Sequence, residues 1–185
     1  MKITHVVGRI LAVMVLAMGA TALSQGSSLA APVAPFARPA GAPTAQDGAQ
    51  PAPFHETYNA LNGAMGTHIS YAESLSYANS VGYGVAVFYD GLGYNNRTGD
   101  TLVIIMPRDC TASTGDKDLR LAEMPGDWND RVSSVTTQMG NGTHCDVWFS
   151  SDINFEGECG NRWIHMQADL RKDGCQNRAS SFELS

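Results

Sequence analysis

Histidines are the first residues to test for catalysis, and four follow the N-terminal 30 residues: His55, His68, His144 and His165. None stands in an H-E-x-x-H array, and the sequence has neither a G-x-S-x-G elbow nor a phosphate-binding loop. A Ser/His/Asp triad can assemble from distant positions, but no spacing here indicates one. His165 lies in the strand-like WIHMQ, where we expect it to face solvent or to pack on Trp163. We therefore expect no enzymatic activity and no catalytic residues.

The cysteines are the next candidates, and all four lie in the C-terminal half: Cys110, Cys145, Cys159 and Cys175. In an exported chain an even number of cysteines indicates disulfides, and four allow three pairings. We favour Cys159–Cys175 with Cys110–Cys145, since each pair ties neighbouring segments. A bridged loop of about 15 residues contributes roughly 3 kcal/mol. The alternative is a zinc site, but the spacings show no C-x2-C pair and no nearby H-x3-5-H.

A short polar segment occurs twice at a spacing near 47 residues. Asn129 to Ser134 reads NDRVSS, and Gln176 to Ser181 reads QNRASS. An aromatic-rich strand that enters a turn precedes each copy: FYDGLGY at 88–94 and WFSSDINFEG at 148–157. Self-similarity at a fixed spacing indicates that one supersecondary unit occurs twice. The simplest role for the Ser-Ser pairs is to hydrogen-bond the adjacent turn, as hydroxyls commonly do.

These motifs resemble the βγ-crystallin superfamily, whose Greek-key motif opens with an aromatic residue, reaches an aromatic-x-Gly turn and later carries [N/D]-[N/D]-x-x-[S/T]-Ser. The resemblance covers residues 83–185 and implies an all-β domain in which two Greek-key motifs form a sandwich. The chain departs from the pattern in three places. Asn96 stands where the first copy should have Gly, one extra residue separates Phe149 from Phe155, and Gln176 replaces Asn or Asp.

In this family the paired motifs bind two Ca²⁺ ions. The resemblance implies hydroxyl ligands from Ser133 and Ser180, carbonyl ligands from Arg131 and Arg178, and side-chain oxygens from Asp130 and Asn177 for the site of the opposite motif. Ca²⁺ takes six to eight oxygen ligands at about 2.3–2.6 Å, so this donor set suits it. Asn177 leaves one site with less negative charge, and the two arginines place cations beside both sites. We therefore expect millimolar to high micromolar affinity.

Two function classes are carried forward. The first is a secreted, non-enzymatic binding module with Ca²⁺ as its ligand. The second is a peptidase inhibitor or a small antimicrobial or killer toxin, because the resemblance extends to a microbial metalloproteinase-inhibitor family and to killer-toxin-like proteins. A preorganised loop loses little entropy on binding, and Pro107 to Asp118, anchored by Cys110, is the favoured loop, with Arg108 and Thr111 as contacts. Gly91–Asp100 is the alternative loop.

The elements that position these residues are short strands separated by clusters of Gly, Asn and Asp, a pattern typical of an antiparallel sandwich or barrel. The clearest strands are Val85–Tyr89 and Thr101–Met106, followed by four more: 131–138, 146–149, 162–166 and 179–184. Residues 54–82 form a poorly defined extension that carries at most a short helix near 70–80. Trp128, Trp148 and Trp163 could form a sugar platform, but tryptophans in a small β-domain usually serve its core.

The N-terminal residues indicate export. Lys2, His5 and Arg9 precede the uncharged apolar run Ile10–Leu23, and Ser28–Ala31 offers the small residues of a cleavage site, so residues 1–30 are interpreted as a secretory signal peptide. Residues 31–53 hold six of the eight prolines and little apolar bulk, which predicts a disordered linker.

The charge of the chain excludes one class of partner. Without residues 1–30 the chain has ten basic against 18 acidic residues, a formal charge of about −8. Nucleic-acid phosphates need clustered Lys and Arg, so no nucleic-acid partner is expected. We also expect no membrane partner and a monomer, with an extracellular protease as the partner under the inhibitor hypothesis.

Overall fold

The computed structural model describes residues 51–137 and 145–185, which belong to one structural unit, Ala34–Ser185. The expected signal peptide (1–30) and residues 31–50 of the expected linker lie outside the described residues, as does His144. Strands predominate over helix in the described part, in agreement with the all-β expectation. Within these ranges no helix is long and apolar enough to cross a membrane.

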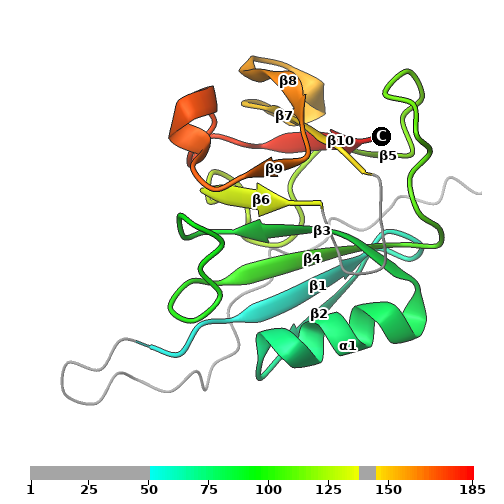
Figure 1. The fold of residues 1–185 in the computed structure, drawn as a ribbon, viewed down its shortest axis with the longest axis vertical. Coiled ribbons are helices and arrows are strands. Elements are labelled where there is room, and N and C mark those ends of the chain that lie inside the picture. The colour runs from blue at the N-terminus through cyan, green and yellow to red at the C-terminus, as the bar shows by residue number, and fades with distance from the viewer. Residues whose placement is uncertain (1–50, 138–144) are drawn as a thin grey trace, which may run out of the picture. The chain divides into compact units, whose positions relative to one another are not determined.

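Ten strands in the described ranges form two sheets (Figure 1). The larger sheet has the order β2 (Ala64–His68), β1 (His55–Asn59), β4 (Thr101–Met106), β3 (Tyr83–Tyr89), β6 (Ser134–Thr136) and β9 (Met166–Gln167). The smaller sheet has the order β5 (Leu119–Leu121), β10 (Ser181–Leu184), β7 (Val147–Ser150) and β8 (Cys159–Ile164). One α-helix, α1 (Tyr71–Val81), and two 3₁₀ turns, η1 (Ile153–Phe155) and η2 (Leu170–Asp173), complete the described elements.

Each of two four-strand runs sends its third strand to the other sheet. In the run β3–β6, β4 and β6 flank β3 in the larger sheet, whereas β5 joins β10 in the smaller one. In the run β7–β10, β8 and β10 flank β7, whereas β9 pairs with β6 in the larger sheet. The fourth strand therefore returns beside the first in both runs, and the exchange ties the two sheets together.

Two apolar cores explain why β3 and β4 are continuous hydrophobic runs. Side chains on one face of these strands, such as Phe88, meet the smaller sheet, where Phe88 lies 5.2 Å from Phe149 and 5.0 Å from Phe182 between ring centroids. Side chains on the other face, such as Val87 and Val103, pack under α1. A strand covered on both faces has no polar side to present, and all six residues of β4 are buried.

The segment 54–82 differs from the expected poorly defined extension. It forms the hairpin β1–β2, and β1 adds to the larger sheet in parallel with β4. The buried face of β1 consists of His55, Thr57 and Asn59. Hydrogen bonds satisfy these polar side chains, for example His55 Nδ1 with Thr101 Oγ1 at 2.9 Å. Hydropathy did not reveal this strand because its inward residues are polar.

The helix expected near 70–80 is confirmed as α1, and its ends follow local chemistry. Ser70 is the N-cap and accepts from the Glu73 N–H at 3.2 Å, while the Glu73 carboxylate accepts from the Ile69 N–H at 3.0 Å. Side chains that satisfy the free amides of a first turn stabilise a helix by about 1 kcal/mol. Gly82 ends the helix where a Cβ would lie 2.6 Å from the Met106 carbonyl oxygen, so only glycine fits.

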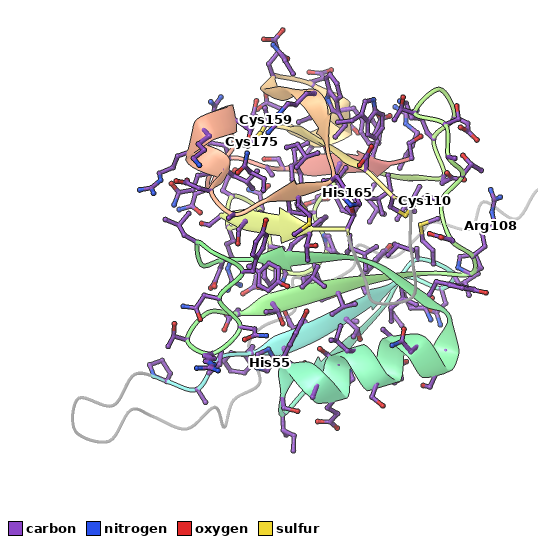
Figure 2. All side chains as sticks on the ribbon, in the orientation of Figure 1. His55, Arg108, Cys110, Cys159, His165 and Cys175 are labelled. Carbon is purple, nitrogen blue, oxygen red and sulfur yellow. A yellow bond between two sulfur atoms is a disulfide. The ribbon has the colours of Figure 1, made fainter. Side chains whose placement is uncertain are left out.

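Both favoured disulfide pairings are present. Cys110 pairs with Cys145, with 5.1 Å between Cα atoms, and Cys159 pairs with Cys175, with 4.8 Å between Cα atoms. The first bridge joins the loop after β4 to the residues just before β7, and the second joins β8 to the turn after η2 (Figure 2). No cysteine in the chain is left as a free thiol.

Removing each bridge tests its contribution to stability. The bridges close loops with sequence separations of 35 and 16 residues, so loop entropy gives about 4 kcal/mol for Cys110–Cys145 and about 3 kcal/mol for Cys159–Cys175. Replacing each pair by alanine should lower the free energy of unfolding in urea by these amounts, in this order. Reactive thiols in the native protein, or a Cys110–Cys175 peptide after digestion without reductant, would contradict the pairing.

Candidate functional site

The two Ser-Ser segments lie at equivalent points of the fold, each leading into the fourth strand of its run. The Asp130 N–H donates to the Ala179 carbonyl at 3.1 Å, and the Asn177 N–H donates to the Val132 carbonyl at 2.9 Å. Asp130 and Asn177 both adopt left-handed backbone angles, with φ of 57° and 52°, a conformation that Asn and Asp tolerate better than most residues. The two copies of the motif therefore bind each other reciprocally through their backbones.

The last serine of each motif has a structural role. The hydroxyls of Ser134 and Ser181 donate at 2.6 Å to turn carbonyls, those of Gly91 and Asp152 respectively. They also accept at 3.1 Å from the backbone N–H groups of Tyr94 and Phe155. These bonds hold the aromatic turns that follow β3 and β7. For these two serines the simple turn-bonding interpretation is correct.

The preceding serines, Ser133 and Ser180, meet the motif of the opposite copy. The Ser180 hydroxyl lies 2.9 Å from the Ser151 carbonyl oxygen and 3.4 Å from Asp130 Oδ1. We call these three oxygens the second half-site. Ser180 is buried, with 7% of its surface exposed, whereas Asp130 is exposed. Solvent can therefore reach the half-site from one side.

The first half-site is built on Ser133 and has a different set of partners. The Ser133 hydroxyl donates to Asn177 Oδ1 at 2.9 Å, and the Gln176 side-chain N–H donates to the same hydroxyl at 3.4 Å. Asn177 is exposed and Ser133 is 1% exposed, as in the other copy. In both copies the Asp130 or Asn177 side chain therefore meets the serine of the opposite motif, and its role as a Ca²⁺ ligand stays a prediction.

The two half-sites offer different oxygen donors to a cation. Two ligands at about 2.4 Å from a Ca²⁺ ion, subtending about 75–90°, lie about 2.9–3.4 Å apart, which matches both spacings around Ser180. The second half-site brings together a carboxylate, a hydroxyl and a carbonyl oxygen. The first offers no carboxylate, and its hydroxyl already accepts an N–H. Within residues 51–137 and 145–185, no three His, Cys, Asp or Glu side chains gather as a metal site, so an ion would depend on hydroxyl and backbone oxygens.

The side chains of the two motif arginines are engaged elsewhere. The Arg131 guanidinium contacts three carboxylates, at 2.5 Å from Asp100, 2.9 Å from Asp127 and 3.3 Å from Asp90, and stacks on the Trp128 ring at 4.9 Å. Arg178 instead donates to the Gly174 carbonyl at 2.9 Å. That Arg131 and Arg178 offer carbonyl oxygens to Ca²⁺ stays a prediction.

The carboxylates around Arg131 crowd one another. Burial raises the pKa of Asp90, and the charge of Asp100 raises it further. Burial also raises the pKa of Glu56, whose carboxylate accepts the Trp128 indole N–H at 2.7 Å. Burial acts to lower the pKa of Arg131, but hydrogen bonds and charges from Asp100, Asp127 and Asp90 outweigh it, so this pKa is raised. Arg131 therefore stays protonated and holds the cluster together.

The described histidines have partners that do not form a catalytic relay. His55 and His68 bond to threonine hydroxyls, at 2.9 Å and 3.2 Å. His165 has two partners that resemble parts of a triad, Thr137 Oγ1 at 3.0 Å and Asp146 Oδ1 at 3.4 Å. Both meet the same nitrogen, Nδ1, so the ring cannot pass a proton between them as a triad histidine does.

The tryptophans divide between core and surface. Trp128 is fully buried in the core between the sheets, as expected. Trp148 and Trp163 are half-buried and meet edge to face with ring centroids 5.8 Å apart. The Lys117 ammonium lies 4.0 Å from the Trp163 ring centroid, so that ring does not present a bare platform to a sugar.

Comparison with known proteins gives one loose structural likeness. No family model matches the chain, and no curated protein matches it. A solved structure from work on the evolution of the eye lens βγ-crystallin domain fold aligns with a TM-score of 0.37 and 15% identity, over 56% of this chain and 87% of that chain. A likeness this loose carries no conclusion about the function of this chain.

Three components of the site lay beyond the sequence pattern. The Ser151 carbonyl is a backbone atom and carries no residue signature. The contact of Gln176 with Ser133 depends on the length of the glutamine side chain. The sequence showed that Gln replaces Asn or Asp at this position, but not which group the longer side chain would contact. Asp90 and Asp100 lie at the two ends of the loop between β3 and β4, so only the fold brings them to Arg131, whereas Asp127 is its neighbour four residues earlier in the chain.

The variant Glu56→Gln tests the charge balance of this cluster. Glutamine keeps an oxygen for the Trp128 indole N–H but removes a half-buried charge near Asp100 and Asp127. Because burial raises the pKa of Glu56 above its unfolded value, ionised Glu56 destabilises the native state at high pH, and this cost disappears as pH falls through the raised pKa. The variant should melt a few degrees above the parent near about pH 8, and the difference should close near about pH 4.

The exposed Glu123 provides the control for this experiment. Glu123→Gln removes the same charge without desolvation, so it should show no comparable pH-dependent gain. If Glu56→Gln melted below the parent at the higher pH, attraction to Arg131 would outweigh the cost of burial.

Proposed function

We propose that this chain is a secreted, non-enzymatic βγ-crystallin-type module that binds Ca²⁺ at its paired Ser-Ser motifs. The observation that carries the proposal is the reciprocal crossing of the motifs, which places Asp130 of one copy beside Ser180 of the other. A hard cation needs a cluster of oxygen ligands, and the crossing brings oxygens of two distant segments together.

The strand connections support the βγ-crystallin-type assignment. A Greek key has connected strands whose fourth member returns beside the first, and β6 pairs with β3 as β10 pairs with β7. Each Ser-Ser segment lies directly before the fourth strand of its run. Because a fold alone does not imply a function, the ligand is proposed from the side chains.

Secretion is supported by two independent features. Residues 1–30 have the cationic start, apolar run and small-residue cleavage site of an export signal. The two disulfides are of the kind that oxidising compartments maintain and the cytosol reduces.

Charge and donor count set the expected strength of binding. Calcium affinity falls with fewer carboxylate ligands and a less rigid site, and the second half-site contributes one carboxylate, Asp130. We therefore propose binding in the millimolar to high micromolar range, suited to extracellular Ca²⁺ levels.

Thermal melting tests the proposal directly. A ligand at about 100 times its dissociation constant adds roughly 2.7 kcal/mol, and one kcal/mol moves the midpoint of a domain of this size by roughly 4 °C. Saturating Ca²⁺ should therefore raise the melting temperature by about 10 °C relative to chelator. Asp130→Asn should remove most of this rise, since it replaces the carboxylate ligand.

Glu73→Gln is the matched control, because it removes one exposed acid on α1, which packs on the face of the larger sheet opposite the smaller sheet. This variant should keep the full Ca²⁺ response, and Mg²⁺ at equal ionic strength should give little. Identical melting of the parent in Ca²⁺ and in chelator would end the calcium proposal.

A second candidate function, inhibition of an extracellular protease, is favoured by the rigidity of the loop 107–118. Its centre is the carboxylate of Asp118, with its side chain 1% exposed, which accepts from Arg108 at 3.1 Å and from the Thr111 N–H at 2.8 Å. The Ser185 hydroxyl donates to the carbonyls of Ser113 and Asp116, and Cys110 is bridged. Such a loop is preorganised for binding.

The structure separates the two contact residues expected on this loop. The Arg108 side chain is 66% exposed and projects from the loop (Figure 2). The Thr111 hydroxyl instead donates to Asp116 at 2.8 Å and to Asp118 at 3.1 Å, inside the loop. Thr111 therefore holds the loop together, and its replacement should also alter stability.

Arg108→Ala should weaken inhibition of a susceptible protease at least tenfold, about 1.4 kcal/mol, with little change in melting because Asp118 keeps its Thr111 donors. Inhibition constants for thermolysin-type and subtilisin-type proteases would measure this. Arg162→Ala is the control, since Arg162 is likewise an exposed arginine paired with a buried aspartate, Asp173. If the unaltered protein inhibits no protease at about micromolar concentration, this second function is excluded.

A further inference from the structure

We propose that the chain binds one Ca²⁺ ion rather than two, because Gln176 closes the first half-site with a hydrogen bond and leaves only the second half-site for an ion. This inference rests on the proposed calcium-binding function. It concerns how this chain departs from the symmetry of its own two motifs.

The residues at the head of each motif act in opposite ways. Asn129 heads the first motif, and its side-chain N–H donates to Asp130 Oδ2 at 3.1 Å. That bond leaves Oδ1 of the same carboxylate facing the Ser180 hydroxyl. Asn129 thus orients a ligand of the second half-site without touching the serine.

Gln176 heads the second motif and is one methylene longer. Its side-chain N–H reaches past Asn177 to the Ser133 hydroxyl, at 3.4 Å. This hydroxyl also donates its proton to Asn177 Oδ1 at 2.9 Å. The Ser180 hydroxyl likewise donates, to the Ser151 carbonyl and to Asp130 Oδ1, so the two half-sites differ in the N–H that Ser133 accepts from Gln176. An ion at the first half-site would compete with this N–H for the hydroxyl oxygen.

The charge of the two half-sites also favours an ion at the second. Asp130 gives the second half-site a carboxylate, whereas Asn177 gives the first a neutral amide. A neutral amide oxygen recovers less energy from a divalent cation than a carboxylate does, so the first half-site has less to gain from an ion that displaces the Gln176 N–H.

The acid that follows Tyr89, Asp90, is already paired with a cation. Asp90 follows Tyr89, whose carbonyl accepts the Ser133 N–H at 2.8 Å, so it corresponds to Ser151 in the other copy. Its carboxylate lies 3.3 Å from the Arg131 guanidinium, which also binds Asp100. Arg131 thus supplies at this position the positive charge that a second ion would otherwise bring.

Titration calorimetry of the purified protein with CaCl₂ tests the stoichiometry. We expect one ion per chain. The two serines form a matched pair, since both are buried and equivalent in the fold. Ser180→Ala should weaken binding at least tenfold. Ser133→Ala should leave the stoichiometry at one ion per chain and change the affinity by less than about twofold.

A measurement on the unaltered protein removes any dependence on whether these variants fold. In ¹H–¹⁵N spectra, added Ca²⁺ should shift the backbone amides of Asp130 and Ser180. The side-chain amide signals of Gln176 and Asn177 should stay in place. Movement of those side-chain amides with Ca²⁺ would overturn the inference.

A variant designed to gain the second Ca²⁺ site tests whether Gln176 and Asn177 are the reason for its absence. Gln176→Asn combined with Asn177→Asp copies the Asn-Asp pair of the first motif into the second, and we expect it to bind two ions. A stoichiometry that stays at one would contradict the assignment of closure to Gln176 and Asn177.

The outcomes distinguish this inference from the function on which it rests. If the unaltered protein binds no Ca²⁺, the calcium function fails and the inference with it. Two ions per chain, or one ion that is lost in Ser133→Ala, would leave the function standing and overturn the inference alone.

Discussion

The reciprocal backbone bonds between the two motifs are the interaction on which the rest of the structure depends. The backbone N–H of Asp130 donates to the Ala179 carbonyl, and that of Asn177 donates to the Val132 carbonyl. Each motif is therefore hydrogen-bonded to the other just before the chain enters β6 or β10. These two strands are the fourth members of their runs, and each also pairs with the third strand of the other run. The crossing, the strand exchange and the aromatic contacts of Phe88 with Phe149 and Phe182 are therefore parts of one arrangement.

The bonds of this arrangement are made between groups of the protein itself. Ser134 and Ser181 tie the aromatic turns to the motifs, and both disulfides restrain the loops around them. An ion bound at Asp130 and Ser180 would add to the stability of the native state, because it would bind the folded chain and not the unfolded one. Because backbone and turn bonds form the shared arrangement, the side chains around Ser133 and Ser180 can differ while the two backbones stay equivalent.

The sequence predicted the parts of the molecule that local patterns encode. The runs at 85–89 and 101–106 are strands because they are apolar on both faces, and the Ser-Ser segments meet because a repeat implies equivalent positions. The strand expected over 131–138 is the shorter β6, and β5 was not expected, since three residues carry little periodic signal. The hairpin β1–β2 was also missed, because its buried side chains are polar and paired.

Equivalent backbones with unequal side chains limit what a motif can reveal about binding. Both copies satisfy the consensus at the serine, yet the hydroxyl of Ser180 faces a carboxylate and that of Ser133 faces an amide. The difference comes from the two residues before the shared arginine, where one methylene in Gln176 redirects a hydrogen bond from its neighbour to the serine itself. A pattern match counts ligands along the chain, but cation binding depends on the charge of those oxygens and on the donors that compete for them.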